Sequence, residues 1–528
     1  MKRREFLKAS LLGGAAAVTG LTRSETASQE VPSFEFDETT IAELRKAIQD
    51  GRADARSITK AYLTRIKNVD QDGPKVNSVI ELNPDAVEIA EELDQRKGPR
   101  GALYGIPVLI KDNIGTADRM ATTAGSLALT ENHVSEDAYI IKRLRKAGAI
   151  ILGKTNLSEW ANFRSTHSSS GWSGRGGQTH NPYALDRNPC GSSSGSGAAA
   201  SANFCAVAVG TETDGSIVCP SATNGLVGIK PTLGLVSRSG IIPLSHSQDT
   251  AGPMARTVRD AAILLGVLAG PDPTDKATKG QRAEVNYTKF LDKAGLKGAR
   301  IGIARKFFGF HAKVDLVMHE AILALKDAGA IIVDPADLPS HGKYDDSEFE
   351  VLLYDFKADL NAYLKAANPK VQSRSLKALI DFNRRHKDTE MPFFGQEIFE
   401  MAQAKGPLTE KKYLEALAKN HRLSREEGID AVMSKYKLDA ILAPTGGPAW
   451  TTDLINGDHF SGGSSTPSAV SGYPAITVPA GYVRGLPVGL TFFGSAWSEG
   501  KLIKLAYAFE QTTKVRKAPK FLLRDELE

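Results

Sequence analysis

The sequence predicts an α/β fold in which a central β-sheet is covered by helices on both faces. From residue 100 onward, short apolar runs alternate with helical patterns. Runs that are apolar at successive positions are typical of strands buried on both sides, and their alternation with helices is typical of a covered sheet. We expect strands within residues 106–110, 149–152, 206–210, 300–304, 330–333, 439–444, 475–481 and 488–494.

Two amphipathic helices are predicted ahead of this region. Thr39 or Thr40 is expected to cap the first, which ends near Gly51, and Ser57 is expected to cap the second. Further along the chain, apolar spacing predicts helices around residues 140–144 and 317–325.

Residues 346–436 lack strand patterns and are predicted to form a mainly helical region on the substrate side. Tyr354, Phe356, Phe393 and Phe394 are the aromatic residues of this region that we considered for a substrate pocket. For each of them, packing in a helical core is the favoured interpretation over contact with substrate.

Composition narrows the function classes. The chain has 528 residues, of which 41% are hydrophobic and 24% charged, and its formal net charge of +5 is spread along the sequence. This balance predicts a globular protein and gives no indication of a nucleic-acid partner. Cys190, Cys205 and Cys219 form no complete disulfide framework and no C-x-x-C spacing, so we expect small buried thiols and no metal site.

The first 28 residues are predicted to be a twin-arginine signal peptide. Arg3 and Arg4 precede a weakly apolar stretch, LLGGAAAVTG, which is too short to span a bilayer as a mature helix. We therefore expect a periplasmic or secreted protein that meets the twin-arginine export machinery and has no stable membrane association. The alternative is a basic start with a chance arginine pair.

A catalytic serine is suggested by the stretch GTETDGSIVCP at residues 210–220, where Ser216 follows a glycine after an apolar run. A serine nucleophile needs a base, and no histidine lies within twenty residues of it on either side. Lys111 ends the apolar run of GIPVLIKDN, where burial at the end of a covered strand favours the neutral amine that a base requires. Between them in the chain lies PCGSSSGSGAAA, with Ser192, Ser193 and Ser194.

These patterns also fit other interpretations. Residues 190–197 resemble a flexible Gly/Ser linker, and GSSSG fits a G-x-S-x-G elbow with Ser193 as nucleophile, although no apolar strand precedes it. SITK at residues 57–60 fits S-x-x-K, but a helix cap explains Ser57 better. A non-catalytic binding protein would have no need of Lys111, Ser192 and Ser216 together.

Taken together, the motifs resemble the amidase signature family. They are GIPVLIKDN, CGSSSGSGAAA, GTETDGSIVCP, the segment from GLVGIKP to AGPMART, and SGYPAITVPAGY with GLPVGLTFFG, and the likeness extends over about residues 37–512. The resemblance implies one large domain, residues 29–528, built on a mixed central β-sheet, and it implies no cofactor and no metal.

The same resemblance implies the roles of the site residues. Ser216 would be the nucleophile, Ser192 a serine in a cis peptide linkage that relays the proton, and Lys111 the base. The backbone N–H groups of Thr213, Asp214, Gly215 and Ser216 would form the oxyanion hole.

The sequence departs from the family pattern in three places. Asp214 and Ser194 stand where the family usually has glycine, and Val218 with Cys219 replaces the usual arginine after the SI pair. Aspartate tolerates left-handed backbone geometry better than most residues. A carboxylate beside an oxyanion hole would nevertheless oppose the developing charge unless its side chain points away.

The resulting hypothesis is an exported serine hydrolase that cleaves carboxamide C–N bonds and releases ammonia. GTETDGSIVCP, SEWANFRS, SSSGWSG and FKADLNAYL look closest to bacterial peptide amidases, which suggests C-terminal peptide amides as substrates. The alternatives are a glutaminase like the A subunit of glutamyl-tRNA amidotransferase, and a fatty or aryl acid amide hydrolase. No substrate-binding residue is predicted, and packing or surface roles are the default for His180 and His246.

Overall fold

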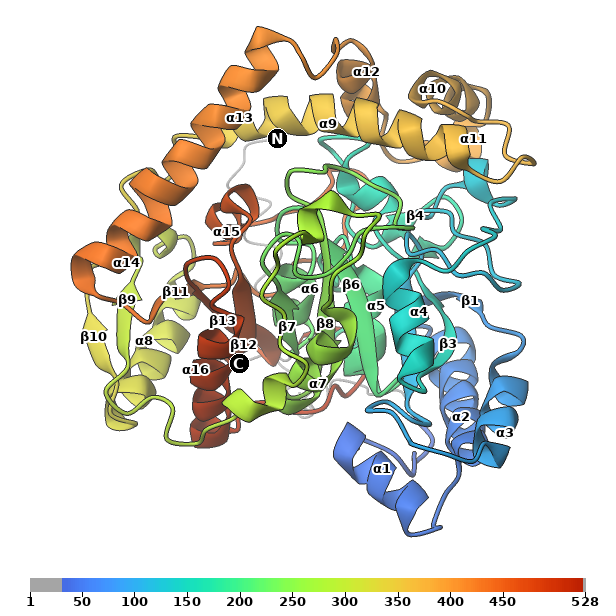
Figure 1. Cartoon of the computed structure of the whole chain (residues 1–528), viewed down its shortest axis with the longest axis horizontal. Coiled ribbons are helices and arrows are strands. Elements are labelled where there is room, and N and C mark those ends of the chain that lie inside the picture. The colour runs from blue at the N-terminus through green and yellow to red at the C-terminus, as the bar shows by residue number, and fades with distance from the viewer. Residues whose placement is uncertain (1–30, 526–528) are drawn as a thin grey trace, which may run out of the picture.

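The structure is a computed structural model that describes residues 31–525. The predicted signal peptide, residues 1–28, lies outside the described residues. One large sheet runs through the middle of the molecule, and the first described residues and the last helix both pack around it (Figure 1).

The described residues form an eleven-stranded sheet and a separate two-stranded hairpin of β4 (Trp172–Ser173) and β5 (Gly177–Gln178). In spatial order the strands of the large sheet are β1 (Val79–Leu82), β3 (Ile150–Thr155), β2 (Pro107–Lys111), β6 (Val207–Glu212), β8 (Thr250–Ala255), β7 (Val227–Lys230), β12 (Ala475–Val483), β13 (Leu486–Phe493), β11 (Ala440–Pro444), β9 (Arg300–Ile303) and β10 (Ile331–Val333).

The sheet is mixed, which confirms the predicted fold class. β2 runs parallel to β3 and β6, and β9 runs parallel to β10 and β11, whereas the other neighbouring pairs are antiparallel. Each of the eight expected runs contains a strand. β1, β7 and β8 were not expected. β8 reads TAGPMA, with glycine and proline inside it, and β7 is only four residues long, so neither has the pattern of a buried strand.

Both faces of the central strands are covered. Every residue of β2, β3, β6, β7, β8, β11 and β13 is buried. Because successive side chains of a strand point to opposite faces, burial at every position requires a layer on each side. α5 packs against β6, α7 against β8, and α8 and α16 against β12.

The helices of the described residues have the following bounds: α1 (Ile41–Gln49), α2 (Ala55–Arg65), α3 (Ala86–Gln95), α4 (Tyr139–Lys146), α5 (Ser194–Ser201), α6 (Val218–Thr223), α7 (Val258–Leu268), α8 (Ala312–Asp327), α9 (Asp345–Ala366), α10 (Leu376–Arg385), α11 (Lys387–Glu390), α12 (Glu397–Gln403), α13 (Lys411–Ser424), α14 (Asp430–Tyr436), α15 (Thr466–Ser471) and α16 (Glu499–Thr513). Short 3₁₀ or π-helical segments lie at Ile66–Asp72, Leu127–Leu129, Glu159–Asn162, Lys276–Thr278, Tyr287–Phe290, Arg305–Phe307 and Arg425–Ile429.

The caps of the first two helices differ in how well they were predicted. Thr40 caps α1 and forms a capping box with Glu43. The prediction that Ser57 caps the second helix is wrong: α2 begins three residues earlier, Asp54 is its N-cap, and the Ser57 side chain completes the capping box from inside the first turn. Asp54 and Ser57 are both good capping residues at the spacing of a box, so the earlier start satisfies more backbone groups.

Helices α9 to α14 occupy residues 345–436 and arch over one end of the sheet (Figure 1). α9 lies across the ends of β6 and β8, where Glu348 accepts a hydrogen bond from Gln248 Nε2 at 2.9 Å. This end of the sheet is the one at which β2 and β6, being parallel, both terminate. Lys111 is the last residue of β2, and the loop with Ser216 follows β6.

Candidate active site

Lys111 sits fully buried at the end of β2 among hydroxyl groups. Its Nζ lies 2.7 Å from Ser192 Oγ, 3.0 Å from Ser193 Oγ and 3.0 Å from Thr211 Oγ1. Burial lowers the pKa of the Lys111 amine from its ordinary value of 10.5 to about 7, although the carboxylates of Asp249 and Glu212 act in the opposite direction. The amine is therefore available in its neutral form near pH 7, hydrogen-bonded to a serine.

The Gly/Ser loop before α5 brings Ser192 to this lysine. The Gly191–Ser192 peptide bond is cis. A Cβ on Gly191 would come within 2.2 Å of Ser158 Oγ, so only glycine fits there. The neighbouring Ser193 hydroxyl donates to the Thr211 carbonyl at 3.0 Å and accepts from its N–H at 3.1 Å. Ser193 thus joins this loop to β6, which is a structural role and not that of a nucleophile in an elbow.

Ser216 lies in a tight turn between β6 and α6. Gly215 has φ of +77°, a left-handed conformation that favours glycine. The Ser216 carbonyl accepts the Ser193 N–H at 3.2 Å, and Glu212 Oε2 accepts the N–H groups of Ile217 and Val218 at 2.7 and 3.0 Å. The turn is therefore held both to the Gly/Ser loop and to the end of its own strand.

Four successive backbone N–H groups in this turn have no intramolecular acceptor. Within residues 31–525, no hydrogen bond is donated by the N–H of Thr213, Asp214, Gly215 or Ser216. Buried backbone N–H groups are almost always paired, so a run of four without partners is typical of an anion-binding turn. These are the four residues predicted for the oxyanion hole.

The Asp214 carboxylate is engaged outside this run of donors. Thr466 Oγ1, at the start of α15, donates to Asp214 Oδ2 at 2.7 Å. Burial raises the pKa of the Asp214 carboxyl above its ordinary value, and the nearby hydroxyl groups of Ser465 and Thr466 act against that rise. Asp214 is therefore tied to α15 through its side chain while its backbone belongs to the turn.

A cavity of about 460 Å³ opens beside the site. Thr211 and Thr213 reach it from the catalytic side, together with Asn113, whose Nδ2 donates to Thr211 Oγ1 at 3.0 Å. The rest of the lining includes apolar residues, chiefly Leu157, Trp160, Ile241, Ile242, Leu244 and Phe356, ionisable residues, Arg238, His246, Asp249, Asp275 and Asp359, and the hydroxyl residues Ser239, Thr250 and Thr274. Lys111, Ser192 and Ser216 are not among the lining residues.

Of the four aromatic residues considered for a pocket, Phe356 lines the cavity. His246, for which a packing or surface role was expected, lines it as well. Tyr354 packs on Tyr413 and donates to Glu410, and Phe394 packs on Trp172. His180 Nδ1 lies 2.8 Å from the Leu185 carbonyl oxygen.

Sequence reasoning did not single out Trp160. It begins a run of three left-handed residues that also contains Ala161 and Asn162, with φ of 50°, 58° and 68°. Non-glycine residues rarely adopt this conformation, and such strain is concentrated at functional sites. Trp160 and Ala161 both line the cavity, so this strained turn shapes its wall.

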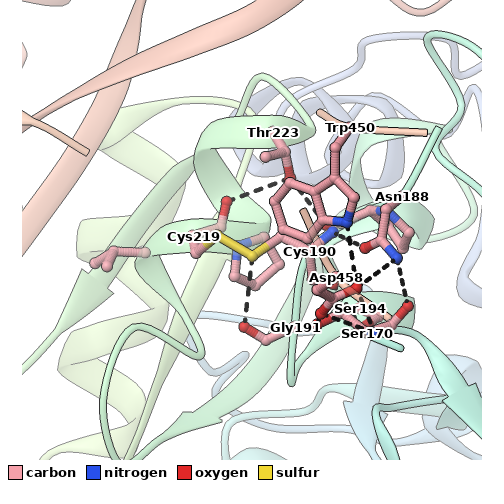
Figure 2. Close-up of a disulfide and its surroundings, with 12 residues drawn as sticks. Ser170, Asn188, Cys190, Gly191, Ser194, Cys219, Thr223, Trp450 and Asp458 are labelled. Carbon is pink, nitrogen blue, oxygen red and sulfur yellow. Dashed lines mark hydrogen bonds between the residues drawn. A yellow bond between two sulfur atoms is a disulfide. The ribbon is translucent and has the colours of Figure 1, made fainter. Parts of the chain in front are cut away.

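Two of the cysteines predicted as buried thiols form a disulfide. Cys190 and Cys219 are bonded with a Cα–Cα distance of 6.1 Å, and only Cys205 is a free, buried thiol in the described chain. The prediction failed because a separation of 29 residues matches no framework spacing. The bond joins the loop before Ser192 to helix α6 after Ser216, as Figure 2 shows.

Two of the departures from the family pattern lie beside each other at this disulfide. Cys219 stands near the usual arginine position and carries one sulfur of the bond. The Ser194 hydroxyl, in place of a glycine, donates to the Cys190 carbonyl at 2.6 Å. Cys190 N–H in turn donates to Asn188 Oδ1 at 2.8 Å, so the loop ahead of Ser192 is anchored on both sides (Figure 2).

Two other kinds of site are absent from residues 31–525. Histidine, cysteine and acidic side chains there do not gather in any group of three that could hold a metal ion. Among the same residues, each helix is too short or too polar to cross a membrane.

Comparison with known proteins gives the family. The Amidase family model matches residues 57–503. A solved structure of the native peptide amidase from Stenotrophomonas maltophilia is 49% identical, with a TM-score of 0.87, and the match covers 93% of this chain and 100% of that one. A peptide amidase solved with the competitive inhibitor chymostatin is 50% identical, with a TM-score of 0.89 and coverage of 92% and 100%.

A probable amidase of Arabidopsis thaliana is 43% identical over 504 residues, which cover 93% of each chain. The matches span the whole sheet, both serine loops and the lysine strand. The protein is therefore an amidase, a hydrolase of carboxamide bonds, and it belongs to the amidase signature family.

Proposed function

We propose that this amidase is an exported serine hydrolase that releases ammonia from the C-terminal amides of peptides. Ser216 is the nucleophile in this proposal, Ser192 relays its proton and Lys111 is the base. The observation that carries the proposal is the 2.7 Å contact between Ser192 Oγ and the fully buried Nζ of Lys111, on a loop bonded to the Ser216 turn.

The first half of the reaction follows from these contacts. Neutral Lys111 accepts the Ser192 hydroxyl proton while Ser192 accepts the proton of Ser216, whose oxygen bonds to the amide carbon. The carbonyl oxygen becomes an oxyanion and is stabilised by the free N–H groups of residues 213–216. When the intermediate collapses, the proton returns along the relay to the leaving nitrogen, the C–N bond breaks and ammonia departs.

The second half removes the acyl group. A water molecule loses a proton to the same relay and attacks the ester carbon of acylated Ser216. The ester bond then breaks, Ser216 recovers its proton, and the peptide acid is released. Because one lysine serves as base and then as acid, its pKa of about 7 suits both half-reactions.

The peptide class of substrate is supported by the cavity and by the relatives. The cavity joins an apolar wall around Trp160 and Phe356 to hydrogen-bonding groups at Asn113 and Thr213, a mixture that suits a peptide chain. Two solved structures of peptide amidase, one of them with bound chymostatin, are about half identical to this chain over nearly its whole length.

Ser216→Ala is expected to lower kcat for amide hydrolysis by at least about 10⁴-fold without unfolding the protein.

The assay measures ammonia release from peptide amides, fatty amides, aryl amides and free glutamine. Highest kcat/KM on peptide amides supports the proposal, whereas preference for glutamine or for fatty or aryl amides would replace it with one of those activities. A fluorophosphonate should label the wild type and spare Ser216→Ala; an unlabelled wild type would count against Ser216 as the nucleophile.

Export is supported by the twin arginines at the N-terminus and by the disulfide, because disulfides persist in oxidising compartments. Replacement of Arg3 and Arg4 by lysine is expected to keep the protein in the cytoplasm. Cell fractionation followed by the ammonia assay measures this. Equal periplasmic activity from both forms would count against a twin-arginine signal.

A further inference from the structure

The carbonyl groups of the Ser216 turn determine where its free N–H groups point. A peptide unit is planar, and in a trans unit the carbonyl of one residue and the N–H of the next point in opposite directions. The Gly215 carbonyl accepts the Cys219 N–H at 2.8 Å, and the Ser216 carbonyl accepts the Ser193 N–H at 3.2 Å. Backbone donors therefore fix two peptide units of the turn.

The Thr213–Asp214 peptide unit, which is trans, is held by a side chain instead. Gln248 Nε2 donates to the Thr213 carbonyl at 3.3 Å, and it also donates to Glu348 Oε1, in the first turn of α9, at 2.9 Å. A side-chain amide nitrogen carries two hydrogens, so these two acceptors use both. Gln248 is only 2% exposed, and the two acceptors fix which way its amide is turned.

Thr213 is held through its side chain as well. Its Oγ1 donates to Asp249 Oδ1 at 2.6 Å, while Asp249 Oδ2 accepts the N–H groups of Leu244 and Ser245 at 2.7 and 2.9 Å. The antiparallel pairing of β6 with β8 ends just before Thr213 and just after Asp249, so these two residues are the next opposing pair. One carboxylate thus joins the turn to the cavity wall, which Leu244 lines.

We propose that Gln248 is a positioning residue that aims the Asp214 N–H at the oxyanion, and that Glu348 and Asp249 support it by holding Gln248 and Thr213 in place. Gln248 keeps the Thr213 carbonyl turned away from the site, where its oxygen would repel the developing negative charge. The inference rests on the proposed function, because that function assigns residues 213–216 to the oxyanion.

Gln248→Leu tests the proposal, because leucine is similar in size and cannot donate. We expect kcat for a peptide amide to fall about 10- to 50-fold, less than the 10²- to 10³-fold typical for loss of an oxyanion donor, since this donor is misaimed and not deleted. KM should stay within about twofold of wild type, because the oxyanion forms only in the transition state.

Gln396→Leu is the matched control. Gln396 is also buried, and its Nε2 donates to a backbone carbonyl, that of Ile380 in α10, at 3.2 Å. This variant should lose comparable stability in a denaturant titration and keep kcat within about twofold of wild type. A fall in kcat that is specific to Gln248→Leu therefore reports on positioning and not on general destabilisation.

A pair of variants at Glu348 tests the same contact from α9. Glu348→Met removes the acceptor that orients Gln248 without changing the turn, and it should lower kcat about threefold to tenfold. Glu348→Gln keeps an oxygen that can accept from Gln248, so it should restore most of this loss. If Gln248→Leu does not fold, this pair decides, and equal kcat in its two members would overturn the proposal.

Equal kcat in Gln248→Leu and Gln396→Leu would also overturn it. A crystal structure of Gln248→Leu needs no activity and should show the Thr213 carbonyl turned from its wild-type direction or occupying two directions. An unchanged carbonyl would contradict the proposal. If the wild type hydrolyses no amide at all, the proposed function fails, and the crystal structure still decides whether Gln248 sets the direction of the Thr213–Asp214 peptide unit.

Discussion

Lys111→Met is expected to lower kcat by about 10³- to 10⁴-fold while leaving the protein folded. The loss follows because methionine fills the same buried space but cannot accept the Ser192 proton, and general-base catalysis contributes an effect of this size. The measurement is ammonia release from a peptide amide at several pH values. Wild-type activity should increase as the pH rises through about 7, where Lys111 loses its proton. The residual activity of the variant should not show this increase.

Lys111→Met should also change how stability depends on pH. The pKa of the amine is about 7 in the folded chain and ordinarily 10.5, so between these values the unfolded chain binds a proton that the folded chain does not. Wild-type stability therefore rises with pH in this window, by about 1.4 kcal/mol per pH unit for this group. Denaturant titrations at pH 7 and pH 9 should show that gain in the wild type relative to the variant.

A second buried lysine provides the control. Lys154 is also fully buried, but its Nζ contacts Thr122 Oγ1 at 3.1 Å and not a serine of the proposed relay. Lys154→Met should keep kcat within about tenfold of wild type. Equal losses in the two variants would mean that Lys111 matters for folding and not for proton transfer.

The central sheet could be predicted because its strands are continuous apolar runs. Residues 106–110 and 206–210 are buried on both faces, and neither run contains a polar side chain that would interrupt its apolar pattern. β8 could not be found in this way, because TAGPMA contains glycine and proline and becomes a strand only through its pairing with β6 and β7. Its stability comes from long-range contacts that a local pattern does not record.

The site was predictable to the extent that its chemistry is local in sequence. Lys111, Ser192 and Ser216 each stand in a short motif of unusual composition, and the structure brings the loops that carry them together. Glu348 had no such signal: it is one acid among several at the start of α9, and its hydrogen bond from Gln248 joins positions far apart in the chain. Trp160 lies in SEWANFRS, but the composition of that segment does not signal its left-handed turn, which is visible only in the backbone.

The disulfide also depends on long-range contacts that a local sequence pattern does not record. Cys190 and Cys219 approach each other because the Gly/Ser loop and the Ser216 turn pack together at the end of β6, where Ser193 N–H donates to the Ser216 carbonyl. The proposed export route carries folded chains, so this packing would bring the two thiols together before an oxidising compartment closes the bond. The bond then secures an arrangement that the fold has already made.

Removal of this bond is therefore expected to weaken both stability and catalysis. For a Cys190→Ala, Cys219→Ala double variant we expect a loss of about 3 kcal/mol in the free energy of unfolding, the size typical for a loop of this length. We also expect about a tenfold lower kcat, because the loops that carry Ser192 and Ser216 lose the covalent link between them and the relay depends on their exact spacing.

Thermal unfolding and ammonia release measure the two effects. Cys205→Ala, which changes the free buried cysteine, should leave kcat unaffected. A double variant with wild-type melting temperature and kcat would show that hydrogen bonds alone hold the two loops in register.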